Sequence, residues 1–377
     1  MSNTLKFGNG EWYGKEGTIL AYNSENNNYK PLPFNFERDS VATRVNKQGL
    51  IETVGADQPR VDYLNDSNGA LLLEPSRTNL ILNSQRISLS PTQNGTFTDN
   101  FAISPDGTQN ATKLTATDTD PFFYQSVSFS AGSYTASIYV KGIGNSVGKD
   151  FQIRLGGSGS AQIEIPSEWT RIEYTATMTS GSANCGIEIP NPSVIGDEVL
   201  VWGWQIEAGS YATSYIPTQG GSVTRVADFC SQTPPDGVIG QTEGVVYCNF
   251  KINNNPTSTR RVVIMSNGTG NERIGISLGN NILYAFIVDG GSTQCEIVKS
   301  SITSGNYKCA FAYNNNDFVF YVNGSQVGTD TNGTVATCDT IEVGNQFGTS
   351  VLEGSINDIK LYNTRLSNSE LAALTQV

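Results

Sequence analysis

The absence of histidine sets the first limit on what this chain of 377 residues can do chemically. Without an imidazole there is no Ser–His or Cys–His nucleophile pair and no histidine-ligated metal. The catalytic chemistry left open is the kind that uses two carboxylates, as in glycoside hydrolysis, where one acts as acid and the other as base or nucleophile. Such a site requires two acids that the fold brings to one face.

The glycine-rich segments do not support phosphate binding. Two of them, Gly10 to Lys15 and Gly144 to Lys149, are one residue shorter than a P-loop, and neither lysine is followed by Ser or Thr. The net charge is −12 and no basic run occurs. Because clustered Lys and Arg side chains are needed to hold a phosphate backbone or an anionic lipid surface, we expect neither nucleic acid nor membrane insertion.

Targeting signals are also missing from the sequence. No run approaches the ~20 apolar residues of a membrane-spanning helix. The first residues, MSNTLKFGNGEWYGKEG, lack the apolar core of a secretory signal. We therefore expect a protein that is made and kept soluble in a cytoplasm, or that leaves it only by lysis.

Aromatic side chains offer the best binding chemistry, because their flat faces stack on sugar rings. The candidate ligand-binding residues are Phe122, Tyr124, Trp204 and Tyr211. Each has a structural alternative. Residues 122–124 place rings on both sides of a strand start, and Trp202 and Trp204 are predicted to share one strand face, which favours core packing. Tyr211 follows that strand in an extended segment, which it could pin to the sheet.

The sequence supports a metal site or a reactive thiol less well than it supports aromatic binding residues. The loops at 314–317 and 330–332, Asn-Asn-Asn-Asp and Asp-Thr-Asn, carry oxygen ligands suited to calcium, but they are also ordinary hairpin turns. We expect no cofactor, with structural calcium as the alternative. The six cysteines show no CxxC pair or metal spacing, and Cys248 and Cys309 alternate with apolar residues. We expect buried free thiols, with a disulfide formed after release from the cell as the alternative.

The elements that must position these residues are β-strands. The chain contains 39 glycines, 10% aromatic and only 15% charged residues, a composition typical of an all-β protein with many turns. The segments YTASIYVKG (134–142), TRIEYTATM (170–178) and VLVWGWQIEA (199–208) alternate apolar and polar residues with period two. Only the end of the chain predicts a helix, with a capping box formed by Ser367 and Glu370.

The order of these patterns predicts an all-β chain with two β-sandwich domains in series behind an extended N-terminal docking segment. Residues 1–70 hold short β-prone pieces with apolar residues such as Phe34 and Phe36, typical of a segment that borrows a core from a neighbour. Steady strands follow, and the Pro-rich stretch SQTPPDGVIG (231–240) marks a domain boundary. The predicted segments are a docking segment (1–70), a first sandwich (71–232), a linker (233–240) and a second sandwich (241–377).

Three groups of segments resemble known families. FERDSVATRVNKQGLIE (36–52) and LLLEPSRTNLILNS (71–84) resemble the N-terminal half of a family of bacteriophage structural proteins. SPDGTQNATKL (104–114), WTRIEYTAT (169–177) and VWGWQIEAGSYATSYIPT (201–218) resemble a carbohydrate-binding-module-like jelly roll. FVFYVNGSQVG (318–328) and GSINDIKLYNTRLSNSELAAL (354–374) resemble the final strands and terminal helix of the concanavalin-like (laminin-G) fold.

The resemblance implies a virion component: a tail fibre, a spike or a head decoration. Such a protein would be made in the host cytoplasm and released by lysis. It would assemble with other virion proteins as a homo-oligomer, a trimer by family analogy, and bind a host surface glycan. The alternatives are a polysaccharide depolymerase of a phage tail and a bacterial surface adhesin, although an adhesin needs a secretion route that the sequence does not show.

Hydrolases on concanavalin-like folds carry the strand pattern E-x-D-x-x-E. The closest match here is Glu37-Arg38-Asp39-Ser40-Val41-Ala42, which ends in alanine and lies outside the second sandwich. We therefore expect no enzymatic activity.

Overall fold

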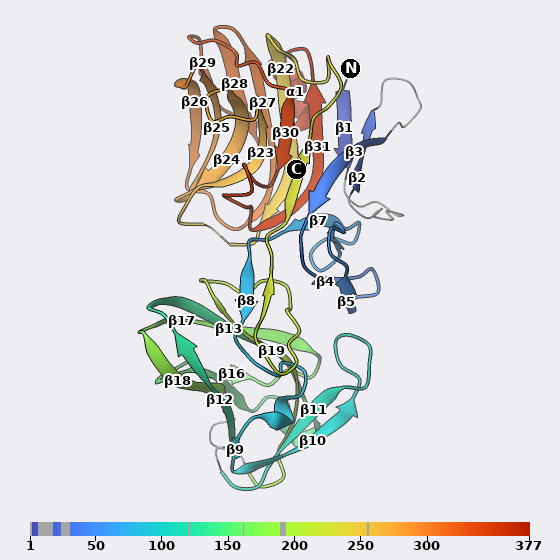
Figure 1. The fold of residues 1–377 in the computed structure, drawn as a ribbon, viewed down its shortest axis with the longest axis vertical. Coiled ribbons are helices and arrows are strands. Elements are labelled where there is room, and N and C mark those ends of the chain that lie inside the picture. The colour runs from blue at the N-terminus through green and yellow to red at the C-terminus, as the bar shows by residue number, and fades with distance from the viewer. Residues whose placement is uncertain are drawn as a thin grey trace. The chain divides into compact units, whose positions relative to one another are not determined.

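The computed structural model of the protein describes residues 2–6, 18–23, 31–119, 121–160, 162–188, 194–254 and 256–377. The chain divides into two compact units. The C-terminal unit comprises residues 1–47, 54–75 and 226–377, and the middle unit comprises residues 48–53 and 76–225. Both consist of antiparallel β-sheets, which confirms the all-β prediction (Figure 1). The glycine-rich segment Gly10 to Lys15 lies outside the described residues.

The C-terminal unit is a sandwich with one core. Its strands are β1 (Ser2–Lys6), β2 (Thr18–Asn23), β3 (Pro31–Glu37), β4 (Ala42–Val45), β6 (Val61–Asp62), β7 (Ala70–Leu73), β21 (Phe229–Gln232), β22 (Glu243–Ile252), β23 (Arg260–Ser266), β24 (Arg273–Gly279), β25 (Ile282–Asp289), β26 (Ser292–Ser300), β27 (Gly305–Asn314), β28 (Asp317–Val322), β29 (Ser325–Asp330), β30 (Thr340–Val343) and β31 (Gly354–Tyr362). The hydrogen-bonded path runs β26-β25-β24-β23-β30-β21-β3-β2-β1-β31-β22-β27-β28-β29, and β7 also pairs with β31. Met265 and Ile276 from one end of this path share a core with Phe311 and Ile359 from the other. The path therefore folds over into two layers.

Strands from early in the chain complete this sandwich. β3 pairs with β2 and with β21, and its Phe34 and Phe36 are buried in the same core as Phe311. β7 adds Leu71 and Leu73, both fully buried. Residues from the segment predicted to dock elsewhere therefore contribute to the core of the C-terminal sandwich, and the docking role stays a prediction. The structure divides the chain differently from the predicted ranges, since residues 54–75 and 226–240 belong to this unit.

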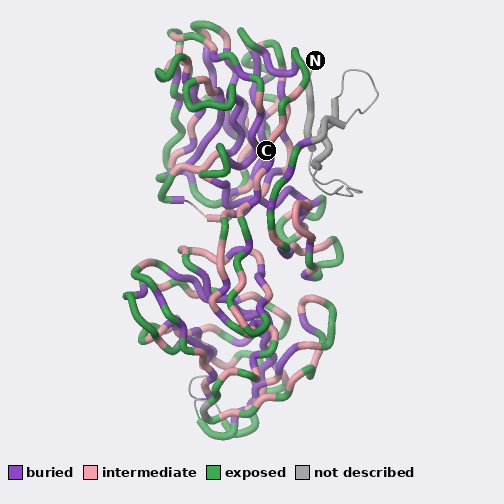
Figure 2. The backbone as a smooth tube through the Cα atoms, in the orientation of Figure 1, coloured by how far each residue is buried: buried purple, intermediate pink, exposed green. Residues whose placement is uncertain are grey.

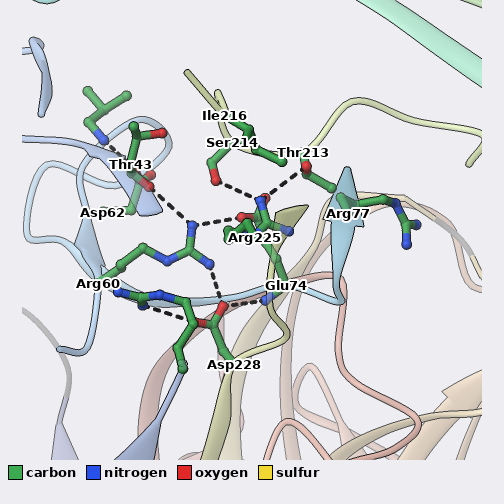
Figure 3. A network of polar contacts seen from close by, with 12 residues as sticks. Thr43, Arg60, Asp62, Glu74, Arg77, Thr213, Ser214, Ile216, Arg225 and Asp228 are labelled. Atoms are coloured by element: carbon green, nitrogen blue, oxygen red, sulfur yellow. Dashed lines mark hydrogen bonds and ion pairs between the residues drawn. The ribbon is translucent and has the colours of Figure 1, made fainter. Parts of the chain in front are cut away.

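A buried network of charged side chains fixes these early segments (Figure 3). Asp228 accepts a hydrogen bond from Arg38 at 3.1 Å and another from Arg60, and all three side chains are fully buried. Arg60 also donates to Glu74 at 2.7 Å and to the backbone oxygen of Thr43 at 3.1 Å. Burial disfavours the charged guanidinium, but the carboxylates of Asp228 and Glu74 outweigh it and raise the pKa of Arg60 above its usual range. Arg60 is therefore a permanent cation held by two anions.

Helix α1 (Asn368–Leu374) covers part of the outer face of this unit. Its N-terminus has the predicted capping box, in which Ser367 Oγ accepts from the Glu370 backbone N–H and the Glu370 carboxylate accepts from the Ser367 backbone N–H. Leu371 is fully buried against Val245 and Tyr247 of β22. No helix in the described part of the chain is long and apolar enough to cross a bilayer.

The middle unit is a second sandwich, made of a five-stranded and a six-stranded sheet. Their orders are β10-β11-β19-β13-β17 and β15-β14-β18-β12-β9, with β16 paired to β14. Its elements are most of β5 (Ile51–Val54), β8 (Arg77–Asn79), β9 (Thr92–Gln93), β10 (Gly95–Ala102), β11 (Ala111–Ala116), β12 (Phe122–Phe129), β13 (Gly132–Gly142), β14 (Asp150–Leu155), β15 (Ser158–Gly159), β16 (Ile163–Glu164), β17 (Thr170–Met178), β18 (Gly181–Glu188), β19 (Glu198–Ala208) and β20 (Val223–Arg225), with short 3-10 turns at Ile87–Leu89 and Gly144–Ser146. Buried residues concentrate inside each unit, and exposed ones lie mainly at turns (Figure 2).

A β-bulge in β19 corrects one prediction. The pairing register with β13 shifts between Tyr139–Trp202 and Ser137–Gln205, and Gly203 takes a positive φ of 67° there. The extra residue reverses the alternation, so Trp204 enters the core while Trp202 packs on Tyr139 outside it. The prediction that both tryptophans share one face is therefore wrong.

The extended segment after β19 is pinned to its own unit. The Tyr215 hydroxyl lies 2.6 Å from Ser84 Oγ, and Thr218 Oγ1 donates to the Ile81 oxygen at 2.6 Å. β20 then pairs with β8, and Arg225 is buried, donating to Thr213 and Ser214 (Figure 3). This segment is thus an ordered part of the sandwich.

The cysteines agree with the expectation of free, buried thiols. All six are buried and none is in a disulfide. Burial raises the pKa of Cys185 to about 11 and that of Cys338 to about 12. Since the thiolate is the reactive form, these thiols are poor nucleophiles near neutral pH.

Candidate functional site

The outer face of the C-terminal sandwich changes from apolar to polar along β22. The side chains of Val246, Cys248, Phe250 and Ile252 point into the core. Their outward neighbours begin with Val245 and Tyr247, which lie under α1. Beyond the helix the outward row continues as Asn249 and Lys251, which are half-buried and line a pocket. The strand therefore leaves a polar surface where the helix ends.

Neighbouring strands extend this polar surface into a pocket of about 200 Å³. On β27, Asn306 lies opposite Lys251 and Lys308 lies opposite Asn249. On the other side, Ser355 of β31 lies opposite Lys251. We call this pocket the asparagine pocket, because five asparagines line it: Asn65, Asn249, Asn253, Asn306 and Asn357. Its lining also includes Ala70 and Leu72 of β7.

Hydrogen bonds within the pocket hold its rim in place. Asn357 donates to Asp66 at 2.5 Å, and Lys308 donates to the backbone oxygen of Gln376 at 2.6 Å. Asp62 accepts from the backbone N–H groups of Val45 at 2.7 Å and Leu64 at 3.0 Å. Burial raises the pKa of Asp62 above its ordinary value, although these N–H groups oppose the shift. Asp62 is therefore a structural acceptor that orders the turn beside the pocket.

The chemistry that this arrangement offers is hydrogen bonding to a polyhydroxylated ligand. An asparagine amide has two donors and one acceptor, which match the paired donor and acceptor character of sugar hydroxyls. The side chains of Asn65, Asn249, Asn253 and Asn306 make no hydrogen bond within the part of the chain that the structure describes. The pocket is smaller than the about 300–1,000 Å³ of drug-sized sites, a size that suits one or two sugar rings.

The predicted aromatic residues of the middle unit lie in different environments. Phe122 and Tyr124 are half-buried on the outer face of the six-stranded sheet, with rings stacked at 5.4 Å and 14°. Phe123 between them is buried in the core and meets Trp204 edge-on. Gly186 lies opposite Tyr124, where an added Cβ would be only 1.9 Å from the Phe123 carbonyl oxygen. Ligand stacking on Phe122 and Tyr124 stays a prediction.

Trp204 and Tyr211 are placed differently. Trp204 is 1% exposed, so its ring presents no face to a ligand and its position corrects the stacking role considered for it. Tyr211 is half-buried, and its hydroxyl accepts from Arg77 at 3.0 Å while the guanidinium lies over its ring at 5.2 Å. Tyr211 thus pins the segment after β19, the structural alternative given for it. The structure brings Phe122 and Tyr124 together and separates both from Tyr211.

The other candidate sites from the sequence are either exposed or held in structural contacts. Glu37 and Asp39 are exposed where β3 ends. In the loops considered for calcium, the side-chain oxygens of Asn315 and Asn316 accept from the backbone N–H groups of Val335 and Gly333. No group of three or more Cys, Asp or Glu able to hold a metal occurs in the described residues. Lys149 of the second glycine-rich segment is paired with Asp197 at 2.6 Å.

Sequence reasoning missed the asparagine pocket, although β22 carries a signal for it. In VVYCNFKI the inward positions stay apolar to the end, while the outward positions change from Val and Tyr to Asn and Lys. The same change occurs in reverse along β27, from Asn306 and Lys308 to Ala310 and Ala312. A polar half-row next to an apolar one indicates a surface that only part of the fold covers.

Comparisons with known proteins bear mainly on the C-terminal unit. Residues 233–372 match the family described as the Concanavalin A-like lectin/glucanases superfamily. The C-terminal sandwich is thus concanavalin-like, and seven of the pocket residues lie within the matched range. No curated protein matches the chain.

Several solved structures are similar over part of the chain. The carbohydrate-binding module CBM40 of the Ruminococcus gnavus IT-sialidase is 18% identical over 36% of this chain and 84% of its own, with a TM-score of 0.31. The receptor-binding domain of the botulinum neurotoxin C/D mosaic serotype is 13% identical over 39% of this chain and 40% of its own, with a TM-score of 0.33. The leech intramolecular trans-sialidase is 18% identical over 37% of this chain and 24% of its own, with a TM-score of 0.31.

Proposed function

We propose that this protein is a non-catalytic glycan-binding protein and that the asparagine pocket is its saccharide site. The observation that supports this most is the set of asparagine amides without internal partners, gathered in one pocket on a concanavalin-like sandwich. Amides that water alone satisfies can exchange those hydrogen bonds for sugar hydroxyls at little cost. Single-site affinity is expected to be low and to rise with the number of copies presented together.

The test is direct binding by the full chain. A glycan array first identifies the oligosaccharides that the protein binds. These are then titrated in soluble form, by calorimetry, into the wild type and into the double variant N249A/N306A. Each amide–hydroxyl bond contributes about 0.5–1.5 kcal/mol, so the double variant should bind about tenfold more weakly. The matched control is N332A, an exposed asparagine of the same unit outside the pocket. Equal affinities for all three proteins would contradict the assignment of the site.

Absence of catalysis is part of the proposal. Glycoside hydrolysis requires two carboxyl groups free to act on opposite sides of the scissile bond. The two aspartates of the pocket are instead acceptors for backbone and side-chain N–H groups, Asp62 for Val45 and Leu64 and Asp66 for Asn357. Incubation with the bound oligosaccharide should release no new reducing ends, and their release would favour the depolymerase alternative.

A virion role is the finer part of the proposal and rests on the sequence resemblance alone. We propose a fibre, spike or head decoration protein that assembles with other virion proteins as a homo-oligomer, a trimer by analogy. The protein would reach the particle in the host cytoplasm and be released by lysis. Immunogold labelling of intact particles and sedimentation of the purified chain test these two points. An unlabelled particle or a stable monomer would contradict them.

A further inference from the structure

Lys251 is one of two lysines that line the asparagine pocket, and Lys308 is the other. Lys251 projects from β22 between Asn306 of β27 and Ser355 of β31, its direct neighbours across the two strand pairs. Asn249 and Asn253 lie two residues away on its own chain, on the same outward side. The neighbours of Lys251 across the two strand pairs and along its own strand therefore carry amide and hydroxyl side chains.

No carboxylate of the described residues forms an ion pair with Lys251, which is half-buried. The second lysine of the pocket, Lys308, donates to the Gln376 carbonyl oxygen at 2.6 Å. The acids nearby are used otherwise. Asp66 accepts from Asn357 at 2.5 Å and Asp62 accepts from two backbone N–H groups. Within the described residues, Lys251 is therefore the lysine of the pocket whose ammonium has neither a carboxylate nor a carbonyl partner.

The chain carries 35 acidic and 23 basic residues, so acids outnumber bases. Other lysines in the middle and C-terminal units, such as Lys113, Lys149 and Lys360, have carboxylate partners at 2.6–3.0 Å. A cation among hydrogen-bonding amides is complementary to an anionic group on a hydroxylated ring, since charge-assisted hydrogen bonds are stronger than neutral ones.

From this arrangement we infer that the pocket selects an acidic saccharide, whose anionic group pairs with Lys251 while its hydroxyls bind Asn249, Asn253 and Asn306. The inference rests on the proposed function and adds the class of ligand. A carboxylate, as in a hexuronate, and a sulfate ester present the same charge to the ammonium. The experiment distinguishes a carboxylate from a sulfate ester.

The experiment compares three ligands and four forms of the full-length protein. The ligands are methyl glucuronide, methyl glucoside 6-sulfate and neutral methyl glucoside, titrated by NMR chemical-shift perturbation, which detects weak binding. The proteins are the wild type, K251M, K251R and the control K299M, which removes an exposed lysine of the same unit outside the pocket.

We expect the wild type to bind at least one acidic sugar about tenfold more tightly than the neutral one, the size of one charge-assisted hydrogen bond. K251M should abolish this preference, while K251R and K299M should retain it. The ligand that shows the larger preference identifies the anionic group. Equal binding of acidic and neutral sugars, or an unchanged preference in K251M, would overturn the inference.

The outcomes also separate this inference from the proposed function. If sugars bind and N249A/N306A weakens them while K251M has no effect, the saccharide site stands and the acidic preference fails. If N249A/N306A has no effect on any bound sugar, or no array glycan and none of the three ligands binds, the proposed function fails and the inference fails with it.

Discussion

At the scale of single residues, buried charged side chains contribute more to the stability of this protein than exposed ones do. The carboxylate of Asp228 is fully buried and receives hydrogen bonds from Arg38, from Arg60 and from the Glu74 backbone N–H. Removing one partner from such a set leaves the other charges buried and uncompensated, which is costly. Exposed pairs such as Lys141–Glu168, where the glutamate side chain is 83% exposed, contribute about 0–1 kcal/mol.

The variant D228N tests this difference. It keeps the shape of the side chain but leaves Arg38 and Arg60 short of an anion, so the free energy of unfolding of the C-terminal unit should fall by about 3–5 kcal/mol. Urea unfolding by circular dichroism measures the loss, and hydrogen exchange of β21 and β31 assigns it to this unit. The control D317N, which breaks a half-exposed pair with Arg365, should lose about 1 kcal/mol or less. Similar losses in both variants would contradict the account.

At the scale of elements, turns and bulges fix where side chains point. The bulge at Gly203 sends Trp202 and Trp204 to opposite faces of β19. The turn between β10 and β11 is ordered in another way, by the carboxylate of Asp106. That carboxylate accepts from Ser104 Oγ, from the backbone N–H and Oγ1 of Thr108, and from Asn110 Nδ2, at 2.7–2.9 Å.

This turn gives the middle unit a specific dependence on pH. Burial alone would raise the pKa of Asp106, but the hydrogen bonds from Thr108, Ser104 and Asn110 outweigh it and lower the pKa below its ordinary 3.8. The folded state then binds a proton less readily than the unfolded state. The stabilisation is therefore complete above the ordinary value and is lost as the pH falls through the lower folded pKa.

We expect D106N to unfold more easily than the wild type by about 1 kcal/mol at pH ~7, and by progressively less as the pH falls below ~4. Fluorescence of the buried Trp202 and Trp204 follows unfolding of this unit in urea. The exposed variant N332A in the other unit serves as the control, with no change at either pH. A difference between D106N and wild type that stays constant from neutral to acid pH would show that Asp106 is not responsible.

At the scale of the whole molecule, the compact units are not consecutive stretches of the chain. The C-terminal sandwich includes β3, β7 and β21, and Phe34, Phe36, Leu71 and Leu73 belong to its core. The ion network likewise joins residues 38–74 to Asp228. The part of the chain that matches the concanavalin-like superfamily, residues 233–372, therefore lacks strands and core residues of its own sandwich.

A chain restricted to residues 233–377 should fail to unfold cooperatively, because apolar surface normally covered by β3, β7 and β21 is exposed. Residues 76–225 should unfold cooperatively alone, because every residue of that core lies between Ile81 and Ile206. Circular dichroism in urea and heteronuclear NMR spectra of both chains measure this. A well-dispersed spectrum and a sharp transition from residues 233–377 would contradict it.

Part of this organisation could be read from residue order alone. Period-two alternation predicts strands such as 134–142 and 170–178, and Ser367 with Glu370 predicts the helix start, because these signals depend on neighbours within a few residues. The same rule misplaces Trp202, since one bulged residue reverses the alternation. The predicted aromatic residues differ in their surroundings for a related reason, because burial by strands distant in the chain decides whether a ring is exposed. Trp204 is buried in the core, Tyr211 is held by Arg77, and Phe122 is half-buried on an outer face.

The sequence by itself determined the β class, the strands, the helix cap and the absence of imidazole chemistry, because each depends on composition or on local periodicity. Tertiary structure alone decided that early strands complete the last sandwich, that Asp228 meets Arg38 and Arg60 across 190 and 168 positions, and that residues of β6, β7, β22, β27 and β31 meet in the asparagine pocket. These outcomes depend on pairing between segments distant in the chain, which hydrogen-bond geometry and core packing select and local patterns do not specify.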